Sequence, residues 1–244
     1  MARNTAKFDW SMLDRNGLTQ VLAEISPKVV GQKLTNVKFH SIISKHIRSR
    51  LPIKVVKKSC ATVDFGHVYT GGLYYSEDDK DRKTSIEVVF VYNPFIETVT
   101  LTHQRFRRMC VLFADTILHE LMHMRQYRSR KFKELPDYAS TAEKTEQREE
   151  QEYLGNPDEI DAYGFNIACE LMDKFKGDEQ QVIKYLSEDQ KGLRRRHNSW
   201  RMYLKAFNHD HDHPIIKRVK KKVIRYIPYA ELGKPYRSKD WISR

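Results

Sequence analysis

A long stretch without proline or glycine, from Phe106 to Arg128, constrains the fold of this chain most. Its apolar residues recur at helical spacing and cover more than one face, a pattern that predicts a helix packed on several sides within a domain. The absence of proline means that nothing interrupts the turns of this helix. The apolar residues are Met109, Val111, Leu112, Phe113, Ile117, Leu118, Leu121, Met122 and Met124.

Within this helix, His119, Glu120 and His123 form the motif His-Glu-x-x-His. Side chains four residues apart share one helix face, so the two imidazoles can bind one zinc ion. Glu120 lies between them, where it can hold a zinc-bound water and accept its proton. Two histidines on a helix are often only solvent-facing or hydrogen-bonded, but the adjoining Glu120 and the buried character of the helix favour a metal site.

A catalytic zinc needs a third protein ligand and an open position for water, and Glu159 is the best candidate for that ligand. Asn156-Pro157 predicts the start of a second helix, because proline is favoured at the first helical position. The alternative is that Glu159 only stabilises the helix dipole, as Asp158 and Asp161 could equally do. Apolar residues that follow predict burial of this helix: Ile160, Phe165, Ile167, Ala168, Leu171 and Met172.

Stabilisation of the tetrahedral intermediate requires a hydrogen-bond donor near the zinc. Tyr163 is the first candidate, because it lies one helical turn after Glu159 on the same face. Tyr153, His197 and a histidine of the cluster 209–213 compete for this role.

The motif around His119 and His123, followed by Glu159-x-x-Ala162, resembles the zincin metallopeptidases whose third ligand is a glutamate, the gluzincins. The stretch 159–172 is similar to the glutamate helix of the ImmA/IrrE-like peptidases, which cleave repressors, and of small phage-encoded metallopeptidases. This resemblance implies zinc as the cofactor, with His119, His123 and Glu159 as ligands and Glu120 as the catalytic base. Two features depart from it: the gap between His123 and Glu159 is longer than in thermolysin-like enzymes, and Tyr163 stands where such relatives often carry Asp or Asn.

The order of the predicted elements indicates an α+β fold. A helix is expected from Trp10 to Val30, strands between Thr35 and Thr102, and helices from Arg105 onward, which suits a zincin-like domain with a mixed or antiparallel sheet. We expect a single domain of residues 1–244, with a basic helical extension at 189–244. The strand candidates are Leu34–Phe39, Ile53–Lys57, Ala61–Tyr69, Gly72–Tyr75, Ser85–Tyr92 and Thr98–Thr102, and Thr70-Gly71-Gly72 is among the turn signals between them.

Later helices are expected at Thr141–Glu152, Asp178–Ser187, Lys191–Phe207 and Pro214–Tyr226. The polar connection Ser129–Tyr153 is either a mobile lid or a solvated segment without a role. In zincins the edge strand of the sheet pairs with an extended peptide, and Ser85–Tyr92 or Thr98–Thr102 would be that strand here.

A net charge of +12 indicates acidic partners without saying anything about the fold. The strongest basic runs are Arg194-Arg195-Arg196 and Lys220-Lys221-Lys222, the latter flanked by Lys217-Arg218 and Arg225. They suit the phosphates of nucleic acid, or are solvated surface. Neighbouring aromatic residues that could stack on bases are Trp200, Tyr203, Phe207, Tyr226 and Tyr229.

The remaining features concern compartment and a second metal site. Three scattered cysteines, Cys60, Cys110 and Cys169, predict free thiols, which suit a reducing cytoplasm. The expected location is the cytoplasm of a bacterial host, or the virion if the protein is encoded by a phage. No apolar run is long enough to span a membrane, and the first residues lack the apolar core of a signal peptide. The alternating cluster His209–His213 has a composition that metals favour, but it also suits a polar linker.

The sequence thus predicts a zinc metallopeptidase with a restricted protein substrate. One alternative is a SprT-like protease that acts on DNA-bound proteins, with the late basic helices holding nucleic acid. Another is a non-catalytic nucleic-acid-binding or virion protein that retains a zincin fold.

Overall fold

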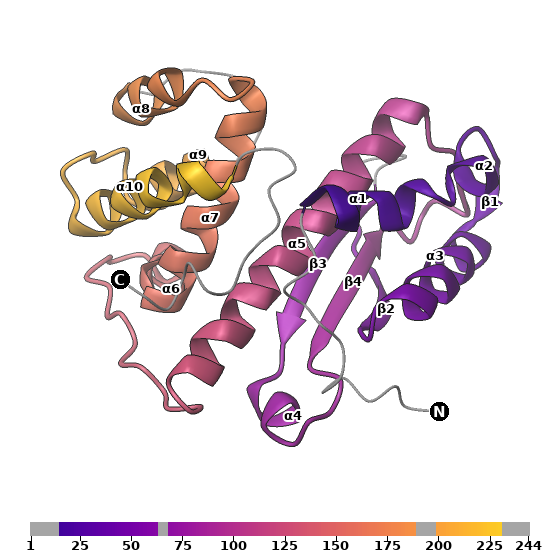
Figure 1. Ribbon diagram of the computed structural model, residues 1–244, viewed down its shortest axis with the longest axis horizontal. Helices are drawn as coiled ribbons and strands as arrows, with labels where there is room; N and C mark the ends of the chain where they lie inside the picture. The colour runs from indigo at the N-terminus through magenta and orange to yellow at the C-terminus, as the bar shows by residue number, and fades with distance from the viewer. Residues whose placement is uncertain (1–14, 63–67, 189–198, 231–244) are drawn as a thin grey trace. The chain divides into compact units, whose positions relative to one another are not determined.

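The computed structural model describes residues 15–62, 68–188 and 199–230 (Figure 1). Contacts between Cα atoms divide the described residues into two compact units, one within residues 15–128 and one within residues 129–230. Strands occur in the first unit, and the described part of the second is helical, which confirms the α+β class with a mostly helical C-terminal half. The expected single domain with an extension at 189–244 stays a prediction.

The first unit begins with helices and one short strand pair. The expected strand Leu34–Phe39 is wrong, because only its first two residues are extended and the chain then turns into a helix. Lys38 N–H donates to the Thr35 hydroxyl at 3.2 Å, which caps that helix. Phe39, Ile43 and Ile47 are buried at every fourth position, a period that suits a helix. The elements are α1 (Arg15–Ala23), α2 (Ser26–Val29), β1 (Leu34–Thr35) and α3 (Asn36–Arg50).

A three-stranded mixed sheet follows, in the order β2-β4-β3. The central strand β4 pairs in parallel with β2 and antiparallel with β3. The short helix α4 follows β3, and β5 pairs with β1 in a separate small sheet. The bounds are β2 (Lys54–Ser59), β3 (Tyr69–Tyr74), α4 (Ser76–Lys80), β4 (Ile86–Tyr92) and β5 (Thr98–Val99).

Helix α5 (His103–Ser129) carries the His-Glu-x-x-His motif and runs along the sheet (Figure 1). The ring of Phe113 stacks on Phe90 of β4, with 6.4 Å between ring centroids. The hydroxyls of Thr116 and Thr70 of β3 lie 3.3 Å apart. Strand β3 and α5 are therefore neighbours at the level of the motif.

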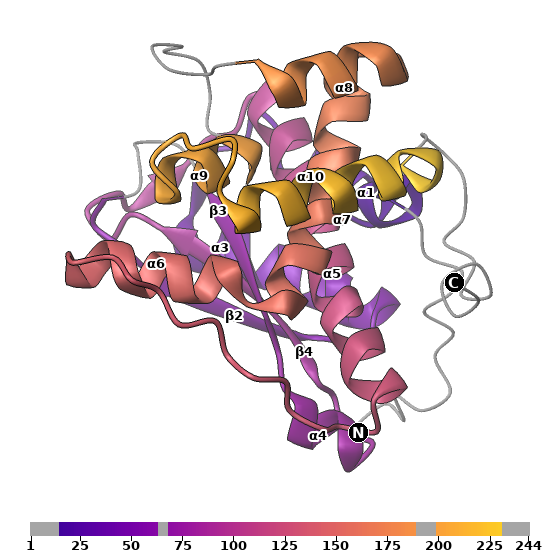
Figure 2. The same cartoon turned by 90° about the vertical axis from the view of Figure 1, so that its left-hand side faces the viewer.

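The regular secondary structure of the second unit, as far as it is described, is helical. Figure 2 shows α10 lying across α7, and Gly164 of α7 makes the close approach possible, because a Cβ there would lie 2.6 Å from Lys222 Cβ. Helix α6 begins later than expected, and the N-terminal part of the helix expected at Lys191–Phe207 lies outside the described residues. The helices are α6 (Thr145–Gly155), α7 (Pro157–Lys174), α8 (Glu179–Ser187), α9 (Ser199–Ala206), α10 (Pro214–Tyr226) and the 3₁₀ turn Ile227–Tyr229.

The segment 130–144 before α6 has no regular helix or strand but is held at several points. Arg130 forms a two-pronged ion pair with Asp158 of α7, at 2.7 and 2.6 Å. Further along, the Tyr138 ring occupies the space where a side chain at Gly155 would project. Its expected role as a lid stays a prediction. Within the described ranges, no helix is both long and apolar enough to cross a bilayer.

Candidate metal centre

His119 and His123 lie one turn apart on α5, and their rings converge. Their Nε2 atoms are 3.1 Å apart, and His119 is only 7% exposed. Two ligand nitrogens on one tetrahedral zinc, each about 2.0–2.1 Å from the metal, would be separated by roughly 3.3 Å. The observed spacing therefore fits two nitrogens that face a common ion.

The other ring nitrogen of His123 has a partner that sequence reasoning missed. In the tautomer whose Nε2 carries no hydrogen, His123 Nδ1 donates to Gln126 Oε1 at 2.9 Å. This arrangement leaves the Nε2 lone pair for a metal and sets the ring orientation. The signal in the sequence is the spacing of three residues on the same helix, which places Gln126 beside His123.

Glu120 is buried, at 6% exposure, against strand β3. A Cβ at Gly72 would lie 2.8 Å from Glu120 Cγ and 2.7 Å from Thr116 Cγ2, and would also overlap the carboxylate. Glycine at this position therefore makes room for the Glu120 side chain. The two glycines of β3, which resemble a turn signal in the sequence, lie in the strand beside the motif.

Of the two strands expected at the edge, Ser85–Tyr92 is wrong, and substrate pairing along Thr98–Thr102 stays a prediction. Strand β4 is the centre of the sheet and β5 belongs to the small sheet, whereas β3 pairs with β4 on one side and with no other described strand. Side chains alternate along β3, with Leu73 48% exposed and Gly72 facing Glu120. The strand edge nearest the motif is therefore that of β3.

Glu159 lies in the first turn of α7, as the Asn156-Pro157 signal predicts. The Asn156 side chain accepts from Asp158 N–H at 2.9 Å and caps the helix. The hydroxyl of Tyr153 on α6 is close enough to Glu159 for the carboxylate charge to act on it. It also lies 3.4 Å from the hydroxyl of Tyr163.

The Tyr153 hydroxyl keeps its proton at neutral pH and can therefore act as a hydrogen-bond donor. Burial of the hydroxyl raises the pKa of Tyr153 far above its usual value, and the negative charge of Glu159 raises it further. The residue as a whole is about half exposed, so the cause lies at the hydroxyl end. Sequence reasoning considered Tyr153 only as a competitor for the oxyanion role and missed its proximity to Glu159.

The two other acids at the start of α7 have structural partners. Asp158 accepts both prongs of the Arg130 guanidinium. Asp161 accepts from the Tyr226 hydroxyl of α10 at 2.7 Å and from Lys222 Nζ. These contacts tie α7 to the segment before α6 and to α10.

One group of three metal-ligand side chains stands out among the residues that the structure describes: His119, His123 and Glu159. Their ligand atoms all lie within 4.8 Å of one another, so the group could hold a metal ion. Two imidazoles and one carboxylate are a donor set that zinc accepts.

The cluster His209–His213 is not such a group in the described structure. Asp210 accepts from Asp212 N–H at 2.8 Å, which forms a turn. His213 Nδ1 accepts from Ile215 N–H at 3.2 Å and caps α10. Burial lowers the pKa of His213, which keeps the ring neutral and able to accept. The cluster thus shapes the entry into α10, and His197 lies outside the described residues.

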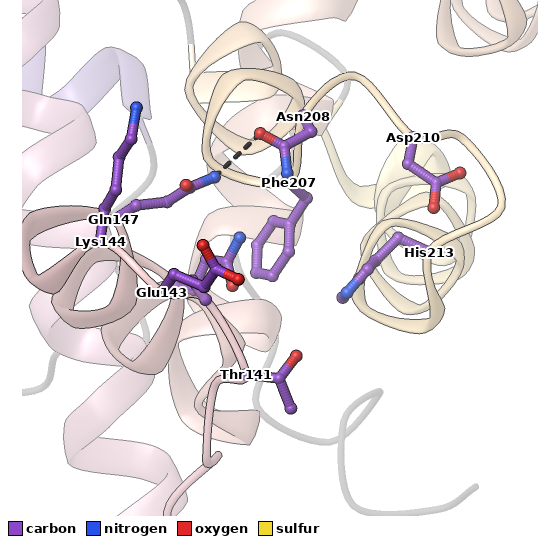
Figure 3. A pocket seen from close by; sticks show the side chains of 10 residues that line it. Thr141, Glu143, Lys144, Gln147, Phe207, Asn208, Asp210 and His213 are labelled. Atoms are coloured by element: carbon purple, nitrogen blue, oxygen red, sulfur yellow. Dashed lines mark hydrogen bonds between the residues drawn. The ribbon is translucent and has the colours of Figure 1, made fainter.

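Beside this turn, a pocket of about 480 Å³ opens between the start of α6 and the end of α9 (Figure 3). Gln147 donates to Asn208 Oδ1 at 2.9 Å across it. The lining combines acidic Glu143 and Asp210 with basic Lys144, so its charge favours no ligand class.

No family model matches the chain, and neither a curated protein nor a solved structure matches it.

Proposed function

We propose that this protein is a zinc-dependent metallopeptidase that hydrolyses peptide bonds of a restricted protein substrate. The observation that carries the proposal is on α5, where two imidazole nitrogens converge and the adjacent residue, Glu120, has a buried carboxylate. The group formed by His119, His123 and Glu159 supports it further, because it supplies three ligands of types that zinc binds.

The residues divide the work as follows. His119, His123 and Glu159 would hold the metal, which when bound would acidify a water molecule and polarise the scissile carbonyl. Glu120 accepts a proton from the attacking water and delivers it to the departing amine, acting first as base and then as acid. Its buried position against β3 limits the orientations that the carboxylate can adopt.

Strand β3 supports the peptide specificity of this proposal. An extended substrate segment can add to its edge as a further strand, through main-chain hydrogen bonds that are independent of side-chain identity. Glu120 faces β3 at Gly72, so the scissile bond of such a segment lies near the base. Leu73, which is exposed, offers an apolar contact to the substrate side chains.

Tyr163 is the proposed donor to the oxyanion. The Tyr153 hydroxyl lies within the influence of the Glu159 charge, which supports a role in positioning that ligand. Tyr163 follows Glu159 by one turn on the same face of α7, which makes it the first candidate for contact with the oxyanion.

The test compares the wild type with Glu120→Gln, which keeps the shape of the side chain but cannot accept a proton. Both proteins are loaded with zinc and incubated with a peptide library derived from a bacterial proteome, and cleavage is measured by mass spectrometry. We expect Glu120→Gln to bind zinc with unchanged stoichiometry and to cleave about 10²–10⁴-fold more slowly.

Two outcomes oppose the proposal. Equal cleavage by Glu120→Gln would remove Glu120 as the base. A zinc-loaded wild type that cleaves nothing in the library would favour the non-catalytic alternative, a protein that keeps the site for its structure.

A further inference from the structure

Helix α10 is the most basic element of the described structure. Its thirteen residues include Lys217, Arg218, Lys220, Lys221, Lys222 and Arg225 and no acidic residue. Its apolar face, formed by Ile215, Ile216, Val219, Val223 and Tyr226, is buried. The helix is therefore fixed on one side and cationic on the other.

The basic residues of α10 do not all face solvent. Lys220 Nζ lies 3.0 Å from His211 Nδ1, and Lys222 donates to Asp161 of α7. The other four, Lys217, Arg218, Lys221 and Arg225, are exposed and form what is called here the α10 basic row.

The α10 basic row lies on a helix whose apolar face is buried. Lys217, Lys221 and Arg225 recur every four residues, so they share one face and span roughly 12 Å at 1.5 Å per residue. Lys217 also pairs with Asp212 at 2.9 Å, but these side chains are 55% and 90% exposed, and such a pair holds the lysine only weakly.

We propose that the α10 basic row binds the phosphate backbone of a nucleic-acid duplex. A duplex carries about one negative charge per 1.7 Å of its axis, and lysine and arginine that contact phosphates release the condensed counterions. Because α10 is already packed against the protein, its basic side chains can contact the phosphates with little loss of conformational entropy.

The structure argues against two other occupants of this surface. A membrane-surface helix inserts its apolar face, but that face of α10 is buried within the protein. A single strand needs aromatic rings on which bases stack, but four of the five expected aromatic residues are buried. The prediction that they stack on bases is therefore wrong for Trp200, Tyr203, Phe207 and Tyr226, and Tyr229 alone of the five is exposed, at 37%.

The structure also narrows the expected interaction to some of the basic residues of α10. Lys220 and Lys222, two of the three lysines of the sequence run, are engaged within the protein, whereas Lys217, Arg218 and Arg225 extend the surface around Lys221. The run Arg194-Arg195-Arg196 lies outside the described residues. The proposed binding is independent of the zinc site, so Glu120→Gln should bind a duplex as the wild type does.

The experiment measures binding of the full chain to a fluorescein-labelled DNA duplex of about two helical turns, by anisotropy, between roughly 50 and 300 mM KCl. The test variant combines Arg218→Ala, Lys221→Ala and Arg225→Ala. The control combines Lys28→Ala, Lys33→Ala and Lys38→Ala, which are exposed in the first unit and remove the same charge. Circular dichroism checks that both variants fold.

The row variant should bind at least about tenfold more weakly at low salt, and its slope of log K against log salt should fall by about three, since each phosphate contact contributes about 0.9. The control should keep the wild-type slope. Absence of duplex binding by the wild type, or an equal loss in the control, would overturn the proposal. So would tighter binding to a single strand than to the duplex, or a row variant that loses binding to phosphatidylserine vesicles but not to the duplex.

Discussion

Three acidic residues at the start of α7 show how environment separates side chains that look alike in the sequence. Asp158 and Asp161 are held by Arg130 and by Lys222 with Tyr226, whereas Glu159 is grouped with the two histidines of α5. Helix-dipole stabilisation is available to all three, so position in the first turn does not distinguish them. Their partners do.

A pair of isosteric changes tests this distinction. Glu159→Gln removes the proposed ligand charge and should weaken zinc binding at least about 100-fold. Loss of a residue that only supports a ligand typically weakens metal binding by about 10- to 100-fold. Asp161→Asn should instead lower the free energy of unfolding by about 1–3 kcal/mol, because Lys222 loses a charged partner. Zinc titration and urea unfolding of both variants provide the measurements. Wild-type zinc affinity in Glu159→Gln would assign the third ligand to another residue.

Tyr153 and Tyr163 are also expected to have different roles, one in zinc binding and the other in catalysis. Tyr153→Phe removes a protonated hydroxyl that can donate to Glu159 and should weaken zinc binding about tenfold. Tyr163→Phe should leave zinc affinity near the wild-type value and lower kcat, because its proposed contact is with the oxyanion. Calorimetric zinc titration and library cleavage separate the two effects, and a reversed pattern would exchange the two roles.

Among the elements, strand β3 and helix α5 depend on each other. The sequence patterns predict the strand and the helix separately, but Gly71-Gly72 has the pattern of a turn. In the structure these glycines lie within the strand. The absence of a side chain at Gly72 leaves room for Glu120, and any larger residue there would overlap it. Glycine in a strand often marks such a close approach.

The two neighbouring glycines provide a matched test. Gly72→Ala should displace the Glu120 side chain and lower cleavage by about tenfold or more while zinc stays bound, because the base moves and the ligands do not. Gly71→Ala meets no atom within 4 Å and should leave activity unchanged, with stability equal or slightly higher. Equal activity in both variants, measured with the same peptides, would contradict the assigned contact.

At the scale of the whole molecule, a bound metal should stabilise the folded protein. A ligand that binds only the native state adds RT ln(1 + [L]/Kd), or about 2.7 kcal/mol at a hundredfold excess over Kd. For a chain of this size that amounts to roughly 5–10 °C in Tm.

Differential scanning fluorimetry of chelator-treated protein with and without zinc measures this shift. The double variant His119→Ala with His123→Ala should show no shift, because it lacks two of the proposed ligands. The same rise in Tm in this variant as in the wild type would place the stabilising metal elsewhere.

The α+β class, the long motif helix, the helix start at Pro157 and the bounds of α10 could all be predicted from local patterns. Helical period, capping residues and the position of proline act over a few residues, so they can be recognised from the sequence alone. The candidate residues His119, Glu120 and His123 belong to this category, since one helical turn relates them.

Only the tertiary structure decided the strand beside Glu120, the partners of Asp158 and Asp161, and the outward-facing members of the α10 basic row. Each of these depends on contacts between residues far apart in the sequence, such as Gly72 with Glu120 or Asp161 with Lys222. The helical period places a side chain on a face, but which neighbour that face meets is set by packing of the whole core.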